Sequence, residues 1–439
     1  MRHAAASNGR VALAVTLVVL AAPLIGYLAT THPLQVLIGL ASLAVIVFLT
    51  LRVELAILLL VASAPLEFFI TLGSSSTLTL SKLTGGIAFA AFALNALATK
   101  RRLIFDMGHG LVFLLLGIAL LSMTQAADLS AAVTTTTRYA SFVALFFLLS
   151  QFVGGHNLQR RIAWTLSLGS CVTGIAADWN FLSGHTLQAR LAQGDPNDIA
   201  FILATTLPFT VWLLRERGIR RWIALLMIPV IAVSIILTLS RGALLGLSVG
   251  LLAYLFFEQR NVRALLATLA AITVAFVLVL ELGGHSIQNG LHAKEKVANT
   301  NVQTRLEAWD AAARLAVAHP FLGVGPSNFR LYYLAATGHP PGTTELKVVH
   351  DAYLDVASEL GIGAFIVFLA YLVLAFARLT SAVRRGLGSP QFASACRVSL
   401  VIAVVAALTL TEQYFAPFWL LGGLASALIH ESSGAPTGS

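Results

Sequence analysis

The chain has 439 residues, of which 58% are hydrophobic and 11% charged, and its formal net charge is +9. A soluble globular domain carries charge on about a quarter of its residues, so this composition excludes that class and predicts an integral membrane protein. The positive charges stand at the ends of apolar runs and form no patch with interleaved aromatic residues, which argues against a nucleic-acid partner.

Apolar runs of about 20 residues recur along the chain between short polar joints, a pattern typical of transmembrane helices. We predict an all-α polytopic membrane protein, a bundle of about 12 to 14 transmembrane helices. The first run is longer than the core of a secretory signal, so we expect a retained helix. The expected spans are residues 11–30, 34–51, 53–72, 82–99, 109–124, 132–153, 162–180, 198–214, 221–239, 242–257, 262–282, 357–377, 395–411 and 416–430.

The joints between these spans alternate in charge, which predicts their topology. With a cytoplasmic amino terminus, the basic joints all lie inside, as the positive-inside rule requires, and the long polar segment before His350 lies in the periplasm. We therefore expect a multi-pass protein of the bacterial inner membrane with three parts. These are a first set of transmembrane helices (1–282), a periplasmic segment (283–356), and C-terminal helices with a cytoplasmic tail (357–439).

Several charged residues fall near the outer ends of their expected helices, and together they indicate a polar cavity on the outer side. Each of them alone is also compatible with an ordinary interfacial flank. They are Glu67, Lys82, Arg138, Asp178, Glu281 and Glu412.

The periplasmic segment predicts one amphipathic helix, over residues 302–318. Val302, Leu306, Trp309 and Ala313 recur at helical spacing opposite charged residues, so we expect this helix to lie on the membrane surface. The following FLGVGPSNF predicts a stiff turn that allows close backbone approach, and residues 337–344 predict another Gly/Pro-rich loop.

Two arginines stand where the predicted topology disfavours positive charge. Arg190 precedes the Pro-Asn start of a helix, and Arg241 interrupts a nearly unbroken apolar stretch. Planar guanidinium groups suit a phosphate or pyrophosphate because each can donate two parallel hydrogen bonds. The alternatives are an ion pair of Arg190 with Asp195 or Asp198, and contact of Arg241 with a lipid phosphate.

His350 opens the helical run HDAYLDVASELGIG and is a candidate general base. The alternative is a structural histidine at a helix end. Asp351, Asp355 and Glu359 share one face of that helix, where such a ridge is usually solvated or paired with basic residues such as Arg305 or Arg314. Because no acidic pair has the pattern of a metal-diphosphate site, we expect neither a metal nor another cofactor.

Over residues 185–425 the chain resembles the O-antigen ligase family, within a superfamily of GT-C-type membrane glycosyltransferases that also contains O-antigen polymerases. The motifs are LSRGALLG, the helix from Arg305 to Trp309 with HPFLGVGPSNF after it, ARLAQGDPNDIA and HDAYLDVASELGIG. The family usually has His-Asn where this chain has His350-Asp351. The resemblance implies pyrophosphate binding by Arg190 and Arg241, a catalytic His350, and the following supporting residues: Asn197, Arg305, Asp351, Tyr353 and Glu359.

The resemblance further implies inverting, metal-independent transfer of a glycan from undecaprenyl pyrophosphate to the lipid A core oligosaccharide, with both lipids held in the outer leaflet. Three other functions remain open at this point. An O-antigen or capsule polymerase and a protein O-oligosaccharyltransferase would use the same arginines. A transporter of lipid-linked glycans would be no enzyme, and the scarcity of charge at mid-membrane depth argues against it.

Overall fold

A computed structural model describes residues 44–69, 79–152, 155–258, 302–337 and 348–431, apart from positions 46, 193, 388 and 412, together with scattered residues between 266 and 290. The expected span at 11–30 and most of the spans at 34–51 and 262–282 lie outside the described residues, as do Glu412 and most of the 337–344 loop. In the part of the chain that the structure describes, helices account for nearly all regular structure, which confirms the all-α prediction.

The described helices follow one another along the chain, and those of the membrane bundle come in the order that the hydropathy pattern predicts. They are α3 (Val53–Leu66), α4 (Leu80–Thr99), α5 (Met107–Ser122), α6 (Leu129–Phe152), α7 (His156–Leu182), α8 (Pro196–Trp212), α9 (Ile219–Leu237), α10 (Arg241–Glu258), the helix of residues 302–318, α12 (Phe329–Thr337), α13 (Ala352–Leu360), α14 (Ile362–Arg385), α15 (Pro390–Ala406) and α16 (Ala416–Glu431), with short 3-10 turns at Glu67–Phe69, Met123–Gln125 and Leu213–Arg215.

Six of these helices, with the turns that extend them, are long and apolar enough to cross a membrane. They are Leu80–Thr99, Met107–Gln125, Leu129–Gln151, Pro196–Arg215, Ile219–Leu237 and Ile362–Arg385. Three shorter apolar helices accompany them, at Arg241–Phe257, Pro390–Ala406 and Ala416–His430. The chain is therefore a multi-pass membrane protein.

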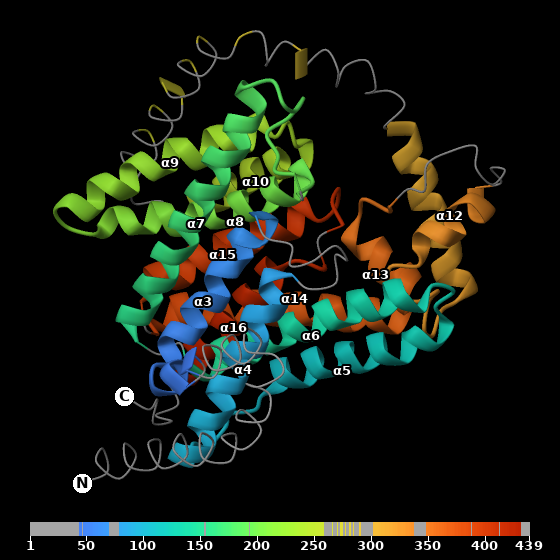
Figure 1. The fold of residues 1–439 in the computed structure, drawn as a ribbon, viewed down its shortest axis with the longest axis horizontal. Helices are drawn as coiled ribbons and strands as arrows, with labels where there is room; N and C mark the ends of the chain where they lie inside the picture. The colour runs from blue at the N-terminus through green and yellow to red at the C-terminus, as the bar shows by residue number, and fades with distance from the viewer. Residues whose placement is uncertain are drawn as a thin grey trace, which may run out of the picture.

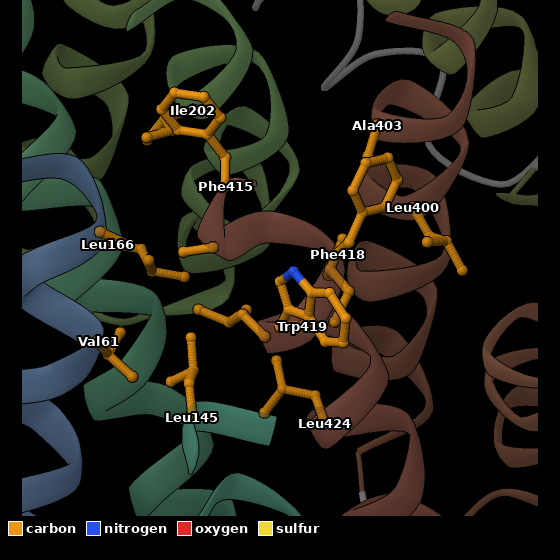
Figure 2. Close-up of a cluster of buried hydrophobic side chains, with 14 of the residues drawn as sticks. Val61, Leu145, Leu166, Ile202, Leu400, Ala403, Phe415, Phe418, Trp419 and Leu424 are labelled. Carbon is orange, nitrogen blue, oxygen red and sulfur yellow. The ribbon is translucent and has the colours of Figure 1, made fainter. Parts of the chain in front are cut away.

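The core of the bundle is centred on α16. Trp419 is fully buried, and its indole Nε1 donates to the carbonyl of Gln413 at 3.2 Å. Val61, Leu145 and Leu166, from α3, α6 and α7, lie on one side of Trp419, and Leu400 and Ala403 of α15 lie on the side of Phe418 (Figure 2). A helix that is buried on all sides is apolar all round, which explains the unbroken hydrophobic run of α16.

Helices α12 and α13 lie together at one end of the bundle, beside the ends of α5 and α6 (Figure 1). Ser122, at the end of α5, donates to the carbonyls of Leu322 and Glu359 at 2.5 and 2.8 Å. The buried Asn328 side chain accepts from the amide of Asp128 at 2.7 Å, in the turn before α6. The helices of the polar segment are thus anchored to the membrane helices.

Helix 302–318 forms as expected, and its alanine-rich face is buried within the protein. Ala308, Ala311, Ala312 and Leu315 are buried against Phe329, Tyr333 and Val349, whereas Val302 and Leu306 are about half exposed, at 52% and 50%. Small alanines on this second face allow the close approach of two helices, a feature that hydropathy does not register. The face with Val302 and Leu306 remains the one that we predict to lie on the membrane surface.

The glycine turn after this helix packs closely against the backbone of two other segments of the chain. A Cβ atom at Gly323 would overlap the backbone of Glu359, and one at Gly325 would lie 2.7 Å from Cα of Ala126. Both glycines have positive φ, +61° and +97°. The close backbone approach that the motif predicts therefore serves to pack the turn against α13 and the α5–α6 connection.

A cluster of partly buried charged residues joins α5, α14 and α16 at the end of α14 away from α13. Asp106, which caps α5, lies 2.9 Å from each of three groups, Arg378 Nη1, His430 Nε2 and His109 Nδ1. Burial by itself would raise the pKa of Asp106, but these hydrogen bonds and the charge of Arg378 together hold it well below its ordinary value. Asp106 is therefore the anion that balances the partly buried Arg378.

Candidate functional site

Arg241 stands at a break between two helices. Helix α9 ends at Leu237, Leu239 adopts a φ of +55°, and α10 begins at Arg241, whose side chain is exposed. A cation at a helix N-terminus is disfavoured by the helix dipole, while an anion there is favoured. Placing Arg241 at the start of the 18-residue α10 therefore makes a site that suits an anion.

The N-terminus of α8 lies beside this break. Ser240 Oγ donates to Asn197 Oδ1 at 2.8 Å, which joins the break to the first turn of α8. Asp195 caps α8 by accepting from the amide of Asn197 at 2.7 Å. Asn197 thus has a structural contact directly beside Arg241.

Arg190 lies on the loop between α7 and α8, and its side chain is exposed. The neighbouring Ala189 donates its amide N–H to the carbonyl of Leu237 at 2.9 Å, so this loop packs against the end of α9, four residues before Arg241. Among the described residues no carboxylate forms an ion pair with Arg190 or Arg241, and the alternative pairing of Arg190 with Asp195 or Asp198 is not seen.

Arg305, on helix 302–318, lies close to Arg241 at the start of α10. Its Nη1 donates to the carbonyl of Thr409 at 3.2 Å, in the connection between α15 and α16. Burial and the neighbouring positive charge of Arg241 lower the pKa of Arg305, and the charge of Asp195 acts in the opposite direction. The structure thus brings Arg241, Arg305 and Asp195 together.

His350 lies just before α13 in a left-handed backbone conformation, with φ of +55°. Its amide donates to Thr411 Oγ1 at 2.9 Å, and the following Asp351 is the cap of α13. Since residues 409 and 411 are at most about 7 Å apart along the chain, His350 and Arg305 are held by neighbouring points of one segment. A non-glycine residue with positive φ is uncommon and is often found at a functional site.

Two of the proposed supporting residues have structural contacts. Asp351 accepts from the amides of Tyr353 and Leu354, each at 2.9 Å, and so caps α13. The Tyr353 hydroxyl donates to the carbonyl of Val404 at 2.8 Å, which fixes α13 on α15. A carboxylate can take this capping role as well as an amide can, so the departure from the usual His-Asn leaves α13 properly started.

Glu359 and Asp355 are buried, not solvated, and neither is paired with Arg305 or Arg314. Glu359 accepts from the amides of Ser327 and Phe329, at 2.6 and 3.2 Å, and from the hydroxyl of Tyr414, while Asp355 accepts from Gln413. Burial raises the pKa of Glu359 to about 6, although its three donors act in the opposite direction.

Burial and the charge of Glu359 raise the pKa of Asp355 well above its ordinary value. Of the two carboxyl groups, Asp355 has the fewer hydrogen-bond donors, and its pKa is raised by the charge of Glu359. This pair joins the start of α12, α13 and the side chains of Gln413 and Tyr414, so we interpret it as structural.

The segment of residues 407–415 was missed by sequence reasoning, apart from the charge of Glu412. It lies beside the start of α10, Arg305 and α13 at once, because Gly242 packs against Thr409 and Leu410. The available signal was the polar sequence TLTEQY between two apolar spans.

The outer charges that the sequence indicates are brought together only in part. Arg138 Nη2 lies 3.1 Å from Glu67 Oε1, and its guanidinium stacks 4.3 Å from the ring of Phe415, at the end of the 407–415 segment. Lys82 lies close enough to Arg138 and Glu67 to interact electrostatically with each of them. Asp178, on α7, instead accepts a hydrogen bond from the hydroxyl of Ser234 on α9 at 2.6 Å.

Comparison with known proteins agrees with the resemblance drawn from the motifs. A family model described as O-antigen ligase matches residues 230–369, a range that contains Arg241, Arg305 and His350 but not Arg190. A search of curated proteins found no match. Residues 230–369 are therefore similar to the O-antigen ligase family, in agreement with the motifs found in the sequence.

Proposed function

We propose that the protein transfers a glycan from undecaprenyl pyrophosphate to the lipid A core oligosaccharide, at the periplasmic face of the bacterial inner membrane. The observation that carries this proposal is the grouping of Arg241 and Arg305 at the start of α10, next to the segment that holds His350. The family match over residues 230–369 supports the same class of reaction.

The arginine group suits the pyrophosphate of the donor. Transfer breaks the bond between the anomeric carbon and the pyrophosphate oxygen, and negative charge develops on that oxygen as it leaves. Guanidinium groups and a helix N-terminus stabilise this charge in advance, so the leaving group needs no general acid. Arg241 and Arg305 would bind the pyrophosphate directly, with Arg190 reaching it from the loop beside α9.

His350 suits the acceptor side of the reaction. The attacking sugar hydroxyl must lose its proton as its oxygen bonds to the anomeric carbon, and a neutral imidazole is a base of suitable pKa. Direct displacement by this oxygen inverts the anomeric configuration. In this proposal Asn197, Asp351, Tyr353 and Glu359 hold the backbone around the reacting groups, and no metal is required because the arginines meet the charge.

The test uses purified protein with carrier-linked glycan and lipid A core. Joined glycan and lipid A core is the expected product. Longer carrier-linked chains would indicate a polymerase. If a polypeptide acceptor is added and becomes glycosylated, the protein is a protein transferase.

His350→Ala should lower the rate by about 10²–10⁴-fold, the usual contribution of a general base. Arg241→Lys, which keeps the charge but loses the planar fork, should lower it by at least about 10-fold. The matched control is Arg314→Lys, because Arg314 is exposed and pairs with Asp310 at 2.8 Å on the surface of helix 302–318. Wild-type rates in the first two variants would contradict the proposed roles.

A further inference from the structure

The segment of residues 407–415, between α15 and α16, contacts Arg305, His350 and α13 through alternate residues. The contacts are the carbonyl of Ala407 with the amide of Ala352 at 2.9 Å, the carbonyl of Thr409 with Arg305 Nη1 at 3.2 Å, Thr411 Oγ1 with the amide of His350 at 2.9 Å, Gln413 with Asp355, and Phe415 with Arg138 at 4.3 Å.

Thr411 has a special place in this series because it holds the backbone of His350 itself. The residues on either side of His350 are fixed, since Val349 is fully buried and Asp351 caps α13. Between them His350 has a φ of +55°, a conformation that a non-glycine residue keeps only when its surroundings enforce it. The hydrogen bond to Thr411 Oγ1 is an enforcing contact of this kind.

The direction of a side chain follows from its backbone conformation, so the same bond determines where the imidazole lies relative to the arginines. The carbonyl of Thr409, two residues before Thr411, accepts a hydrogen bond from Arg305. Thr409 also lies against Gly242, next to Arg241. The spacing between base and cations is therefore set by one short piece of backbone.

We propose that Thr411 is a positioning residue for glycan transfer: its hydroxyl holds the backbone of His350 in the left-handed conformation that aims the imidazole at the acceptor hydroxyl. Thr411 itself touches no substrate. This inference rests on the proposed function, and it assigns a role to a segment outside the matched residues 230–369.

The test compares Thr411→Val with Thr411→Ser. Valine keeps the shape of threonine but cannot accept a hydrogen bond, whereas serine keeps the acceptor. Because a misplacement of about 1 Å can cost on the order of 100-fold in rate, Thr411→Val should lower kcat by about 10- to 100-fold. KM for carrier-linked glycan should stay within about twofold, and Thr411→Ser should restore most of kcat.

Thr124→Val is the matched control. Thr124 lies in the turn after α5, where its hydroxyl donates to the carbonyl of Leu121 at 2.7 Å without contacting the site. It should leave both constants unchanged. If Thr411→Val fails to accumulate in the membrane, Thr411→Cys replaces it, since sulfur is a weak acceptor, and the same loss of kcat is expected.

Wild-type kcat in the variant that lacks the acceptor would overturn the proposal, as would equal loss in Thr411→Ser or a change in KM alone. Failure of the proposed function is distinguishable from this. In that case His350→Ala would itself retain full activity, whereas failure of the positioning role leaves His350→Ala inactive and Thr411→Val active.

Discussion

Gly242 allows α10 to pack directly on the 407–415 segment, and Gly242→Ala tests whether this packing sets the geometry of the site. A Cβ atom at position 242 would overlap Thr409 Oγ1 and lie 3.0 Å from Cγ of Leu410. Favourable carbon–carbon contacts lie at about 3.5–4.0 Å, so the segment must move away by about 0.5–1 Å. Overpacking of this size costs about 1–3 kcal/mol, and the preference of a helix for alanine over glycine returns about 1 kcal/mol.

The expected net loss of unfolding free energy is therefore small, about 0–2 kcal/mol. The loss of activity should be much larger, because the displaced segment holds both Arg305 and His350. A shift of about 1 Å in the reacting groups can lower the rate on the order of 100-fold, so we expect kcat to fall by about 10- to 100-fold. The assay measures transfer to lipid A core together with thermal unfolding in detergent.

Gly110→Ala is the matched control for this prediction. Gly110 lies in α5, and a Cβ atom there would have no described neighbour within 4 Å. That variant should keep full activity and unfold at the same or a slightly higher temperature. The reasoning is refuted if Gly242→Ala is as active as Gly110→Ala, since the packing of α10 on residues 407–415 would then have no influence on the chemistry.

Two further predictions concern buried charges. The pKa of Glu359 is raised from 4.5 to about 6. Between these pH values the folded protein still holds a proton that the unfolded chain has released. The free energy of unfolding should therefore fall by about 2 kcal/mol as the pH rises through this window. Glu359→Gln should lack that slope in a series of thermal melts, while the exposed Asp310→Asn should retain it; equal slopes in all three proteins would contradict the assignment. Asp106→Asn should lower the unfolding free energy by about 3 kcal/mol, because it leaves the partly buried Arg378 without its counter-charge. Unfolding within about 2 °C of wild type would exclude this role.

The membrane class and most helix positions follow from the sequence because they depend on local hydropathy. The expected spans from residue 82 to residue 257 correspond one by one to α4–α10, with ends that differ by a few residues. The start of the span after His350 was less accurate. Helix α13 crosses the expected boundary at residues 356–357, and α14 begins at Ile362, after Gly361 with its φ of +91°.

The candidate site shows both sides of this comparison. Arg241 and His350 attract notice in the sequence, because a charge in an apolar run and a histidine at a helix start are costly or unusual. The grouping of Arg305 with Arg241 could be seen only in the folded chain. It depends on the contact of Arg305 with Thr409, which lies 104 positions later in the sequence. Asp355 and Glu359 show the opposite error, because a ridge that usually faces solvent is here buried beneath Gln413 and Tyr414.

The sequence by itself determined that this protein is a helical membrane bundle, where most of its helices run, and which charged residues are exceptional. These properties depend on the free energy of each residue in lipid or water, which can be read one position at a time. Only the tertiary structure decided which residues meet. The role of residues 407–415, the buried alanine face of helix 302–318 and the left-handed backbone of His350 all come from packing between distant elements, and no local pattern of residues records such contacts.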